Sequence, residues 1–402
     1  MSAPNKPALF VFGTVAIDAM GIGIIIPVMP DLLEELSALP LGEAARWGGY
    51  LAFSYALMQF LFSPLIGALS DRFGRRPVLM VSLGTLGVDY LVMAVAPALW
   101  LLFLGRLIAG VAGATYATAT AYIADVTPKA DRAAAFGMVG AGFGVGFVLG
   151  PVIGGIMGEF GTRAPFYAAA ALAFANLAYG YVFLPESLAP EHRRRVDWTR
   201  ANPLGAMAHL SRMPMIAWFL GVIFLYALAH TVYPAVWSFF TKEAFDWSPA
   251  EIGWSLALVG IGFAVVQMGL IRLFLARFGA VVTTYLGLGF NVLGLTAIAL
   301  VTQGWMLYAL MPLIALGDIV KPALTGLMSN RVADDAQGEL QGVIASVQSV
   351  TTVISPLLTT QVFAMFTTPP GTYLPGAPFL VAAMAMGLAA LVFRKGLARG
   401  RG

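Results

Sequence analysis

Twelve apolar stretches follow one another along the 402 residues, and short polar segments separate them. An α-helix needs about 20 apolar residues to cross the roughly 30 Å of hydrocarbon in a bilayer, so each stretch predicts one membrane span. The stretches are continuously apolar, whereas the strands of a membrane β-barrel alternate between apolar and polar residues. The predicted spans are 7–30, 46–69, 77–97, 99–123, 134–158, 164–184, 214–240, 249–275, 280–302, 304–328, 339–366 and 376–394.

The composition agrees with an integral membrane protein. Hydrophobic residues make up 59% of the chain and charged residues only 11%, and the mean hydropathy is +0.83, far outside the usage of soluble globular proteins. The first stretch is too long for a signal peptide, contains Asp18 and lacks a small-residue cleavage site, so we expect it to remain as the first helix. The absence of cysteine excludes disulfides and thiol chemistry.

Basic residues gather on one side of the predicted membrane. The loops opposite the N-terminus carry only Arg46, Arg163 and Lys242. By the positive-inside rule, the sequence predicts a multi-pass protein of the cell's inner (plasma) membrane with both termini in the cytoplasm. The run "EHRRR" at 191–195 fits contact with lipid headgroups, and we expect no nucleic-acid partner. The basic residues on the side of the N-terminus are Arg72, Arg75, Arg76, Lys129, Arg132, Arg193, Arg194, Arg195, Arg272, Arg277, Arg331, Arg394 and Lys395.

The two halves of the chain resemble each other at a shift of about 205 residues. This shift aligns "RFG" at 72–74 with "RFG" at 277–279, and it also aligns the pairs Trp100 and Trp305, Gly137 and Gly342, and Pro151 and Pro356. We therefore predict an all-α membrane protein of twelve transmembrane helices in two pseudo-symmetric six-helix halves. The halves would be 1–184 and 214–402, joined by a cytoplasmic linker at 185–213. Duplicated units of this kind are typical of secondary transporters that expose a midplane site alternately to each side.

Three motifs carry a resemblance to a known family. "GALSDRFGRRP" at 67–77, "GRLIAGVAG" at 105–113 and "GFVLGPVIGG" at 146–155 resemble signatures of the major facilitator superfamily, the last of them typical of its drug:proton antiporters. "DAMGIGIIIPVMPDLL", "GATYATATAYIADVT" and "GELQG" resemble its twelve-helix tetracycline efflux branch. The resemblance implies the major facilitator fold. It also implies export of a drug-like or amphipathic small molecule in exchange for protons by alternating access, without a cofactor and as a monomer in the lipid bilayer.

Two of these motifs have a conformational interpretation. The resemblance implies that Asp71 and Arg75, together with Asp125, form a charge cluster that acts as a gate and latches the halves while the cytoplasmic side is closed; a solvated loop that fixes the topology is the alternative. In the third motif, the residues that we expect to permit close helix packing and a bend are Gly146, Gly150, Pro151, Gly154 and Gly155. These glycines do not form a phosphate loop, because no strand precedes them and no Lys-Ser or Lys-Thr follows.

Five charged residues fall inside the predicted spans: Asp18, Asp89, Arg106, Asp318 and Lys321. Ionisable residues within a membrane are costly and are functional candidates by default. Asp18 lies near mid-bilayer, where a desolvated carboxylate can bind a proton in one state and release it in another, so we predict proton coupling at Asp18 and Asp89. The alternative is mutual neutralisation, between Arg106 and Asp18 and, on one helix face, between Asp318 and Lys321.

Polar and aromatic residues in the same spans predict a substrate cavity, although each could instead make a helix-packing hydrogen bond. Tetracycline exporters carry a histidine in helix 8 and an acidic residue in helix 9, where this chain has Phe263 and Asn291. These departures leave the substrate open, and Lys321 could meet an anionic group. The candidate substrate-binding residues are Tyr55, Gln59, Arg106, His230, Tyr233, Trp237, Gln267, Asn291, Asp318 and Lys321.

Other classes of function have weaker support. With three histidines, no cysteine and no HExxH, GxSxG or Walker pattern, the chain predicts no catalytic residues, no metal site and no enzyme. Uptake of a small organic solute, driven by protons or facilitated, is the alternative within transporters. A non-transporting receptor or lipid-handling protein is the alternative outside them. Stoichiometry and oligomeric state do not follow from the sequence.

Overall fold

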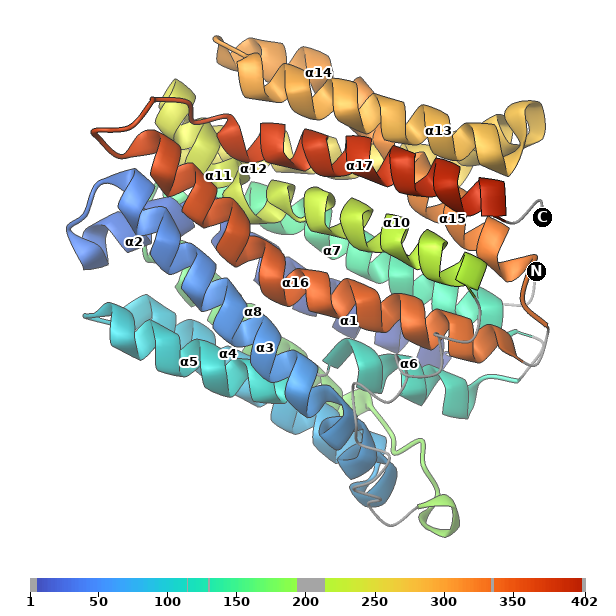
Figure 1. Cartoon of the computed structure of the whole chain (residues 1–402). Helices are drawn as coiled ribbons and strands as arrows, with labels where there is room; N and C mark the ends of the chain where they lie inside the picture. Colours follow the sequence, from blue (N-terminus) through green and yellow to red (C-terminus); the bar gives the residue numbers. More distant parts are fainter. Residues whose placement is uncertain (1–5, 114, 129–130, 194–213, 334–335, 400–402) are drawn as a thin grey trace. The chain divides into compact units, whose positions relative to one another are not determined.

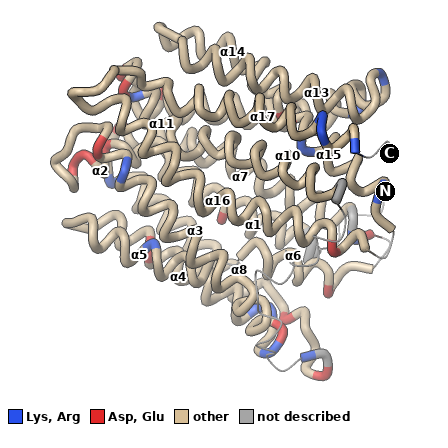
Figure 2. Tube along the Cα trace, in the orientation of Figure 1, with Lys and Arg blue, Asp and Glu red and all other residues tan. Residues whose placement is uncertain are grey.

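The computed structural model describes residues 6–113, 115–128, 131–193, 214–333 and 336–399. Helices account for nearly all of these residues, as Figure 1 shows. Part of the predicted linker, 194–213, and the basic residues Lys129, Arg194 and Arg195 lie outside the described residues. In Figure 2 most charged residues lie near helix ends, and few interrupt the apolar middle of the helices.

The first part of the chain forms eight α-helices and two short 3-10 turns before the linker. A Gly113 break separates α5 from α6 within one membrane span. The elements are α1 (Lys6–Ile25), η1 (Ile26–Val28), α2 (Met29–Ser37), α3 (Leu41–Phe73), α4 (Arg75–Val95), α5 (Leu99–Ala112), α6 (Thr115–Val126), α7 (Arg132–Gly158), α8 (Ala164–Phe183) and η2 (Pro190–His192).

The second part contains two segments that depart from α-helical geometry inside membrane spans. Of these, η4 is a π-helix and η5 is a 3-10 helix. The elements are α10 (Pro214–His230), α11 (Val232–Phe245), α12 (Pro249–Val265), η4 (Val266–Leu270), α13 (Ile271–Leu300), α14 (Gly304–Leu316), η5 (Gly317–Ile319), α15 (Val320–Ser329), α16 (Gln337–Thr367) and α17 (Ala377–Arg399).

The predicted spans agree with the helices. Within the described ranges, 11 helical segments are long and apolar enough to cross a membrane. One of them, Pro249–Leu300, has 52 residues and joins two predicted spans. Gly279 divides it, because its φ of 71° and ψ of 166° are not helical. The fold is therefore an all-helical, multi-span membrane protein, as the sequence predicts.

Residues that correspond in the sequence repeat also have similar local structure. Gly74 (φ 106°) and Gly279 (φ 71°) are the last residues of the two "RFG" motifs, and both have the positive φ that favours glycine. Trp100 and Trp305 are 66% and 62% exposed. Each tryptophan lies at the start of a helix that follows an extended residue. Corresponding residues of the two halves therefore share backbone conformation and exposure.

The contacts divide the chain into two compact units. The first contains Met1–Ala38, Ser54–Asn202 and Trp247–Ala257, and the second contains Leu39–Phe53, Pro203–Asp246 and Leu258–Gly402. These units differ from the predicted halves at two helices, since the beginning of α12 belongs to the first unit and the beginning of α3 to the second. The division into halves at 184 and 214 stays a prediction.

Within the first unit, α7 packs closely on α1 through a row of glycines. A Cβ added at Gly146 would overlap the carbonyl oxygen of Ala16, and one at Gly154 would overlap that of Ile24. Between them, a Cβ at Gly150 would lie 2.6 Å from the carbonyl oxygen of Met20. Small residues at four-residue spacing allow helices to approach this closely in membranes. The glycines of the third motif thus occupy the helix contact for which we expect them.

A second close contact occurs once in each unit, at corresponding residues. In the first unit, a Cβ at Gly253 of α12 would overlap the carbonyl oxygen of Pro151 on α7. In the second unit, a Cβ at Gly49 of α3 would lie 3.1 Å from the carbonyl oxygen of Pro356 on α16. Gly49 and Gly253, like the two prolines, are related by the shift between the halves. These contacts explain why each unit takes the beginning of one helix from the other half.

We expect Gly146→Ala to destabilise the protein, because the added methyl group needs space that the α1 backbone occupies. Overpacking of this kind typically costs about 1 to 3 kcal/mol. Gly144→Ala is the matched control, since nothing lies within 4 Å of a Cβ at Gly144 on the same helix. Thermal unfolding of both purified variants in detergent measures the difference. An equal midpoint for the two variants would contradict the packing assigned to Gly146.

Candidate functional site

A network of charged side chains surrounds Arg75 at the beginning of α4, within the first unit. The Arg75 guanidinium forms salt bridges with Asp71, at 2.6 Å, and with Asp125, where Nε lies 3.0 Å from Oδ2. It also donates a hydrogen bond to Ser70 Oγ. Arg75 is only 9% exposed. The structure therefore brings together the three residues of the predicted gate cluster.

Glu186 is a member of this network that the sequence did not identify. Its Oε1 accepts a hydrogen bond from the backbone N–H of Arg75 at 2.9 Å, and it also accepts from the N–H groups of Ser187 and Leu188. A carboxylate at the first residue of α4 is favourable, since the N–H groups of a first helical turn have no partner within the helix. Gly74 leaves room for it, because a Cβ there would overlap the Glu186 carboxylate.

Arg106 of α5 forms an ion pair with Asp89 of α4. The side chains are 12% and 2% exposed, so the pair is almost fully buried. Gly105 allows this arrangement, because a Cβ there would lie 2.6 Å from Asp89 Oδ1. The alternative pairing of Arg106 with Asp18 is not the one that the structure contains. A carboxylate with a permanent counter-ion needs no proton to be neutralised, so this geometry assigns Asp89 to balancing Arg106.

Asp18 of α1 lies near two tyrosines. It interacts electrostatically with Tyr55 of α3 and Tyr90 of α4. The ring of Tyr55 also lies under the guanidinium of Arg106, 5.4 Å from its Cζ, which connects Asp18 to the buried pair through a shared neighbour. Among the residues that the structure describes, Asp18 forms neither a hydrogen bond nor an ion pair. Its charge is therefore without a fixed counter-ion.

Gln59 packs one turn away from Tyr55. Its amide donates a hydrogen bond to the carbonyl oxygen of Gly113, at the break between α5 and α6. A Cβ at Gly113 would lie 2.8 Å from the Tyr55 hydroxyl. Gln59 thus satisfies a backbone group that the helix break exposes, which is the packing alternative for this residue.

In the second unit, several of the predicted residues lie around Asp318. Its Oδ1 accepts a hydrogen bond from the Tyr226 hydroxyl at 3.2 Å, and its Oδ2 accepts one from the Gln267 amide at 2.6 Å. The Nε2 of His230 lies 4.0 Å from Oδ1. Asp318 is 7% exposed. Tyr226 is a member of this cluster that sequence patterns did not distinguish from other buried tyrosines.

Lys321 does not pair with Asp318. It is exposed, whereas Asp318 is buried, and no ion pair joins them among the described residues. The three-residue spacing predicted a shared helix face, but neutral donors from α10 and η4 already occupy the carboxylate oxygens. The prediction of an internal ion pair is therefore wrong.

The remaining candidates for substrate binding pack against other side chains or bond to backbone groups. Tyr233 and Trp237 are buried, with ring centroids 6.3 Å and 6.2 Å from that of Phe379. Asn291 donates hydrogen bonds to the carbonyl oxygens of Gly287 and Gly317. Phe263 packs against His230, with centroids 5.3 Å apart. The two positions that depart from the tetracycline branch thus lie directly beside His230 and beside the residue that precedes Asp318.

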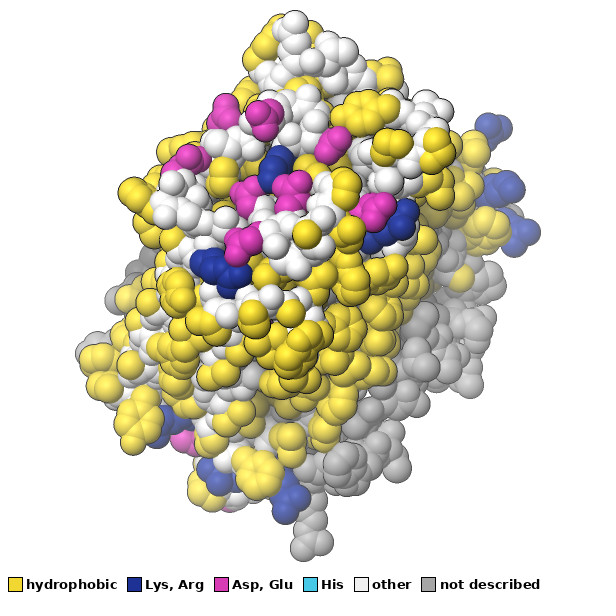
Figure 3. All heavy atoms as spheres, turned by 90° about the vertical axis from the view of Figure 1, so that its left-hand side faces the viewer, with side chains coloured by type: hydrophobic (Ala, Val, Ile, Leu, Met, Phe, Trp, Pro, Cys, Tyr) yellow, Lys and Arg dark blue, Asp and Glu magenta, His cyan; other side chains and the backbone are white. Residues whose placement is uncertain are grey.

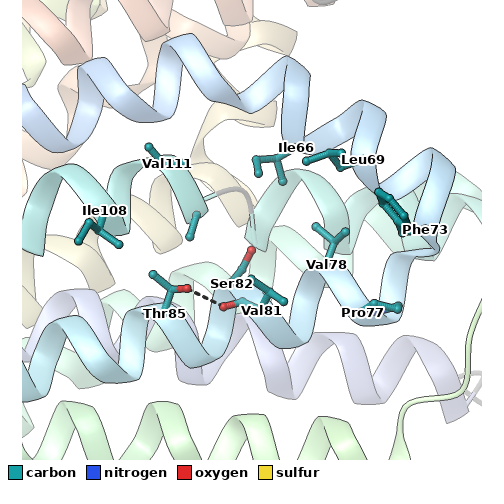
Figure 4. A pocket seen from close by; sticks show the side chains of 11 residues that line it. Ile66, Leu69, Phe73, Pro77, Val78, Val81, Ser82, Thr85, Ile108 and Val111 are labelled. Atoms are coloured by element: carbon teal, nitrogen blue, oxygen red, sulfur yellow. Dashed lines mark hydrogen bonds between the residues drawn. The ribbon is translucent and has the colours of Figure 1, made fainter. Parts of the chain in front are cut away.

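An apolar pocket of about 530 Å³ lies between α3, α4 and α5 in the first unit. Figure 4 shows aliphatic side chains and Phe73 around it, with Thr85 bonded to the Val81 carbonyl of its own helix. None of the charged residues inside the spans contributes to its lining. The pocket therefore offers little for recognising a polar substrate.

Comparison with known proteins gives the family. The model of the Major Facilitator Superfamily matches residues 11–356. The chain belongs to this superfamily. It is 42% identical over 360 residues to the class C tetracycline resistance protein of Escherichia coli, which covers 90% of each chain. The class E protein of the same organism is 40% identical over 358 residues, covering 88% of this chain and 87% of the relative.

Solved structures of the superfamily share the fold. The nucleoside transporter NupG aligns with a TM-score of 0.79 at 14% identity, covering 98% of this chain and 99% of that one. The human organic anion transporter MFSD10 aligns with a TM-score of 0.69 at 21% identity, covering 98% and 100%. The superfamily consists of transporters, so the protein is a membrane transporter and not an enzyme.

We expect Asp89→Asn and Arg106→Gln each to lower thermal stability strongly, since either change leaves its partner as an uncompensated buried charge. Such losses are typically about 3 to 5 kcal/mol. The double replacement removes both charges and should recover much of the loss. Asp18→Asn is the control, because it breaks no ion pair. A double variant as unstable as the sum of the two single variants would refute the pairing.

Proposed function

We propose that this protein exports a tetracycline-class drug from the cell in exchange for protons. Drug export coupled to protons rests on membership of the superfamily and on the high similarity to several tetracycline resistance proteins. The choice of tetracyclines is supported by those relatives' names and by the near-complete coverage of both chains.

The observation that carries the coupling mechanism is the contrast between Asp18 and Asp89. Asp89 is neutralised by Arg106, whereas Asp18 forms no ion pair among the described residues. A half-buried carboxylate inside a membrane span and without a counter-ion can be stabilised by a proton or by the cationic group of a drug, and the two exclude each other. Such competition is sufficient to exchange protons for substrate when the site opens to each side alternately.

The orientation follows from the distribution of charge. Arg72, Arg75 and Arg76 lie at one end of α3 and α4. Figure 3 shows the face at the other helix ends, where acidic side chains are prominent among the charged groups. The positive-inside rule then supports cytoplasmic termini in a bacterial inner membrane. In this orientation the network around Arg75 faces the cytoplasm, where it would act as the latch that the family resemblance implies.

We expect Asp18→Asn to abolish uphill tetracycline accumulation by inverted membrane vesicles, because an amide cannot carry the proton. Exchange of labelled for unlabelled tetracycline needs no proton and should continue. The amount of folded protein should equal that of the parent, since Asp18 has no ion pair to lose. Uphill accumulation at the rate of the parent would remove Asp18 from the coupling mechanism. If the parent protein exchanges no tetracycline at all, the proposed substrate is wrong.

Arg75→Ala should loosen the latch, because the guanidinium joins Asp71, Asp125 and Ser70. Distances between spin labels across the cytoplasmic helix ends should then shift toward the open population. Arg76→Ala is the control, since Arg76 donates to the Tyr181 carbonyl and stays outside the network. Unchanged distance distributions in Arg75→Ala would show that the cluster only fixes the loop.

A further inference from the structure

Asp318 is a buried carboxylate whose hydrogen-bond partners are both neutral. Tyr226 donates to Oδ1 and Gln267 donates to Oδ2. Among the described residues no lysine or arginine lies within ion-pair distance of it. A carboxylate inside a membrane without a cationic partner is costly. Two neutral donors orient the group without removing its charge.

The group nearest to Asp318 that can become cationic is His230. Its Nε2 lies 4.0 Å from Oδ1. The ring of His230 is held from two sides, by Tyr226 with centroids 5.4 Å apart and by Phe263 with centroids 5.3 Å apart. Histidine is the side chain that changes its charge near neutral pH. The imidazole is therefore positioned beside the carboxylate and can supply the positive charge that the site lacks.

The backbone at this cluster departs from α-helical geometry on two sides. Gln267 belongs to the π-helix η4, and Asp318 belongs to the 3-10 turn η5. These segments pack against each other. Short π and 3-10 segments within longer helices are frequent at functional sites, because they redirect side chains and free backbone groups. The hydrogen bond from Gln267 to Asp318 joins the two irregular segments.

The charged and titratable groups around His230 come from a few elements. Asp318 and Lys321 are the charged groups that act on the imidazole. Tyr226 of α10 and Tyr233 of α11 face it as neutral phenols. The residues that η4, α12 and α13 contribute here are uncharged: Gln267, Phe263 and Asn291.

We propose that His230 and Asp318 form a second proton-binding site, separate from Asp18 and located in the second unit. The proton binds to Nε2 of His230, and the imidazolium is then neutralised by the Asp318 carboxylate. In the deprotonated state the imidazole is neutral, and Tyr226 and Gln267 alone hold the carboxylate.

This inference deepens the proposed proton exchange by adding a second proton, yet its principal test needs neither transport nor a drug. The chain contains three histidines. Imidazole NMR signals of the detergent-purified protein with labelled histidine therefore give a small spectrum, in which the variant His230→Gln identifies the signal of His230. The signal is followed between about pH 5 and pH 8, the range in which histidine normally changes its charge.

In the parent protein we expect His230 to convert between imidazole and imidazolium within this range. In Asp318→Asn it should stay neutral throughout, because the imidazolium has lost its counter-ion. Tyr226→Phe is the control, since it removes a neutral donor and leaves both members of the pair in place.

Identical His230 titrations in the parent and in Asp318→Asn would overturn the proposal, as would a His230 that stays neutral in the parent. If Asp318→Asn does not fold, the titration of the parent decides, and a His230 that stays neutral there overturns the proposal. A failed tetracycline assay with an intact His230 titration would refute only the proposed drug. A normal tetracycline assay with no His230 titration would refute only the second proton site.

Discussion

The cost of an uncompensated charge in the hydrocarbon core of a bilayer determines how the interior of this protein is arranged. Arg106 is the cation that meets this requirement through a fixed partner, since Asp89 lies against it and both are nearly buried. Asp18 and Asp318 meet it differently, because neither forms an ion pair with a lysine or arginine in the described chain. Their charge must be compensated by something that can leave, and this requirement makes them candidates for exchange.

The second constraint is the space between helices. Where glycine faces a carbonyl oxygen, as Gly146 faces Ala16, two helices approach until no side chain fits between them. The contact of Gly253 with Pro151 recurs as that of Gly49 with Pro356. Residues related by the shift of about 205 therefore share a pair of backbone contacts. Each of these contacts joins helices from different halves of the sequence.

The sequence was sufficient to predict the spans, because hydropathy and helix length are properties of single segments. It also separated the spans 249–275 and 280–302, between which the non-helical Gly279 lies. It did not predict that Arg106 pairs with Asp89, since depth along a helix does not give rotation about its axis. The sequence did not identify Tyr226 and Glu186, for a related reason. Their importance arises from a partner distant in the sequence, Asp318 in one case and the beginning of α4 in the other.

Asp18 and Asp318, the two carboxylates without a lysine or arginine partner among the described residues, lie in different mechanical settings. Asp18 is on α1, which is held along its length against the glycine row of α7, so α1 cannot shift alone when the charge of Asp18 changes. Asp318 lies in a 3-10 turn beside a π-helix, where small changes in backbone hydrogen bonding can absorb a change of charge locally. Proton binding at Asp18 must therefore act on the packed α1 and α7 as one body. At Asp318 and His230, a local rearrangement is sufficient.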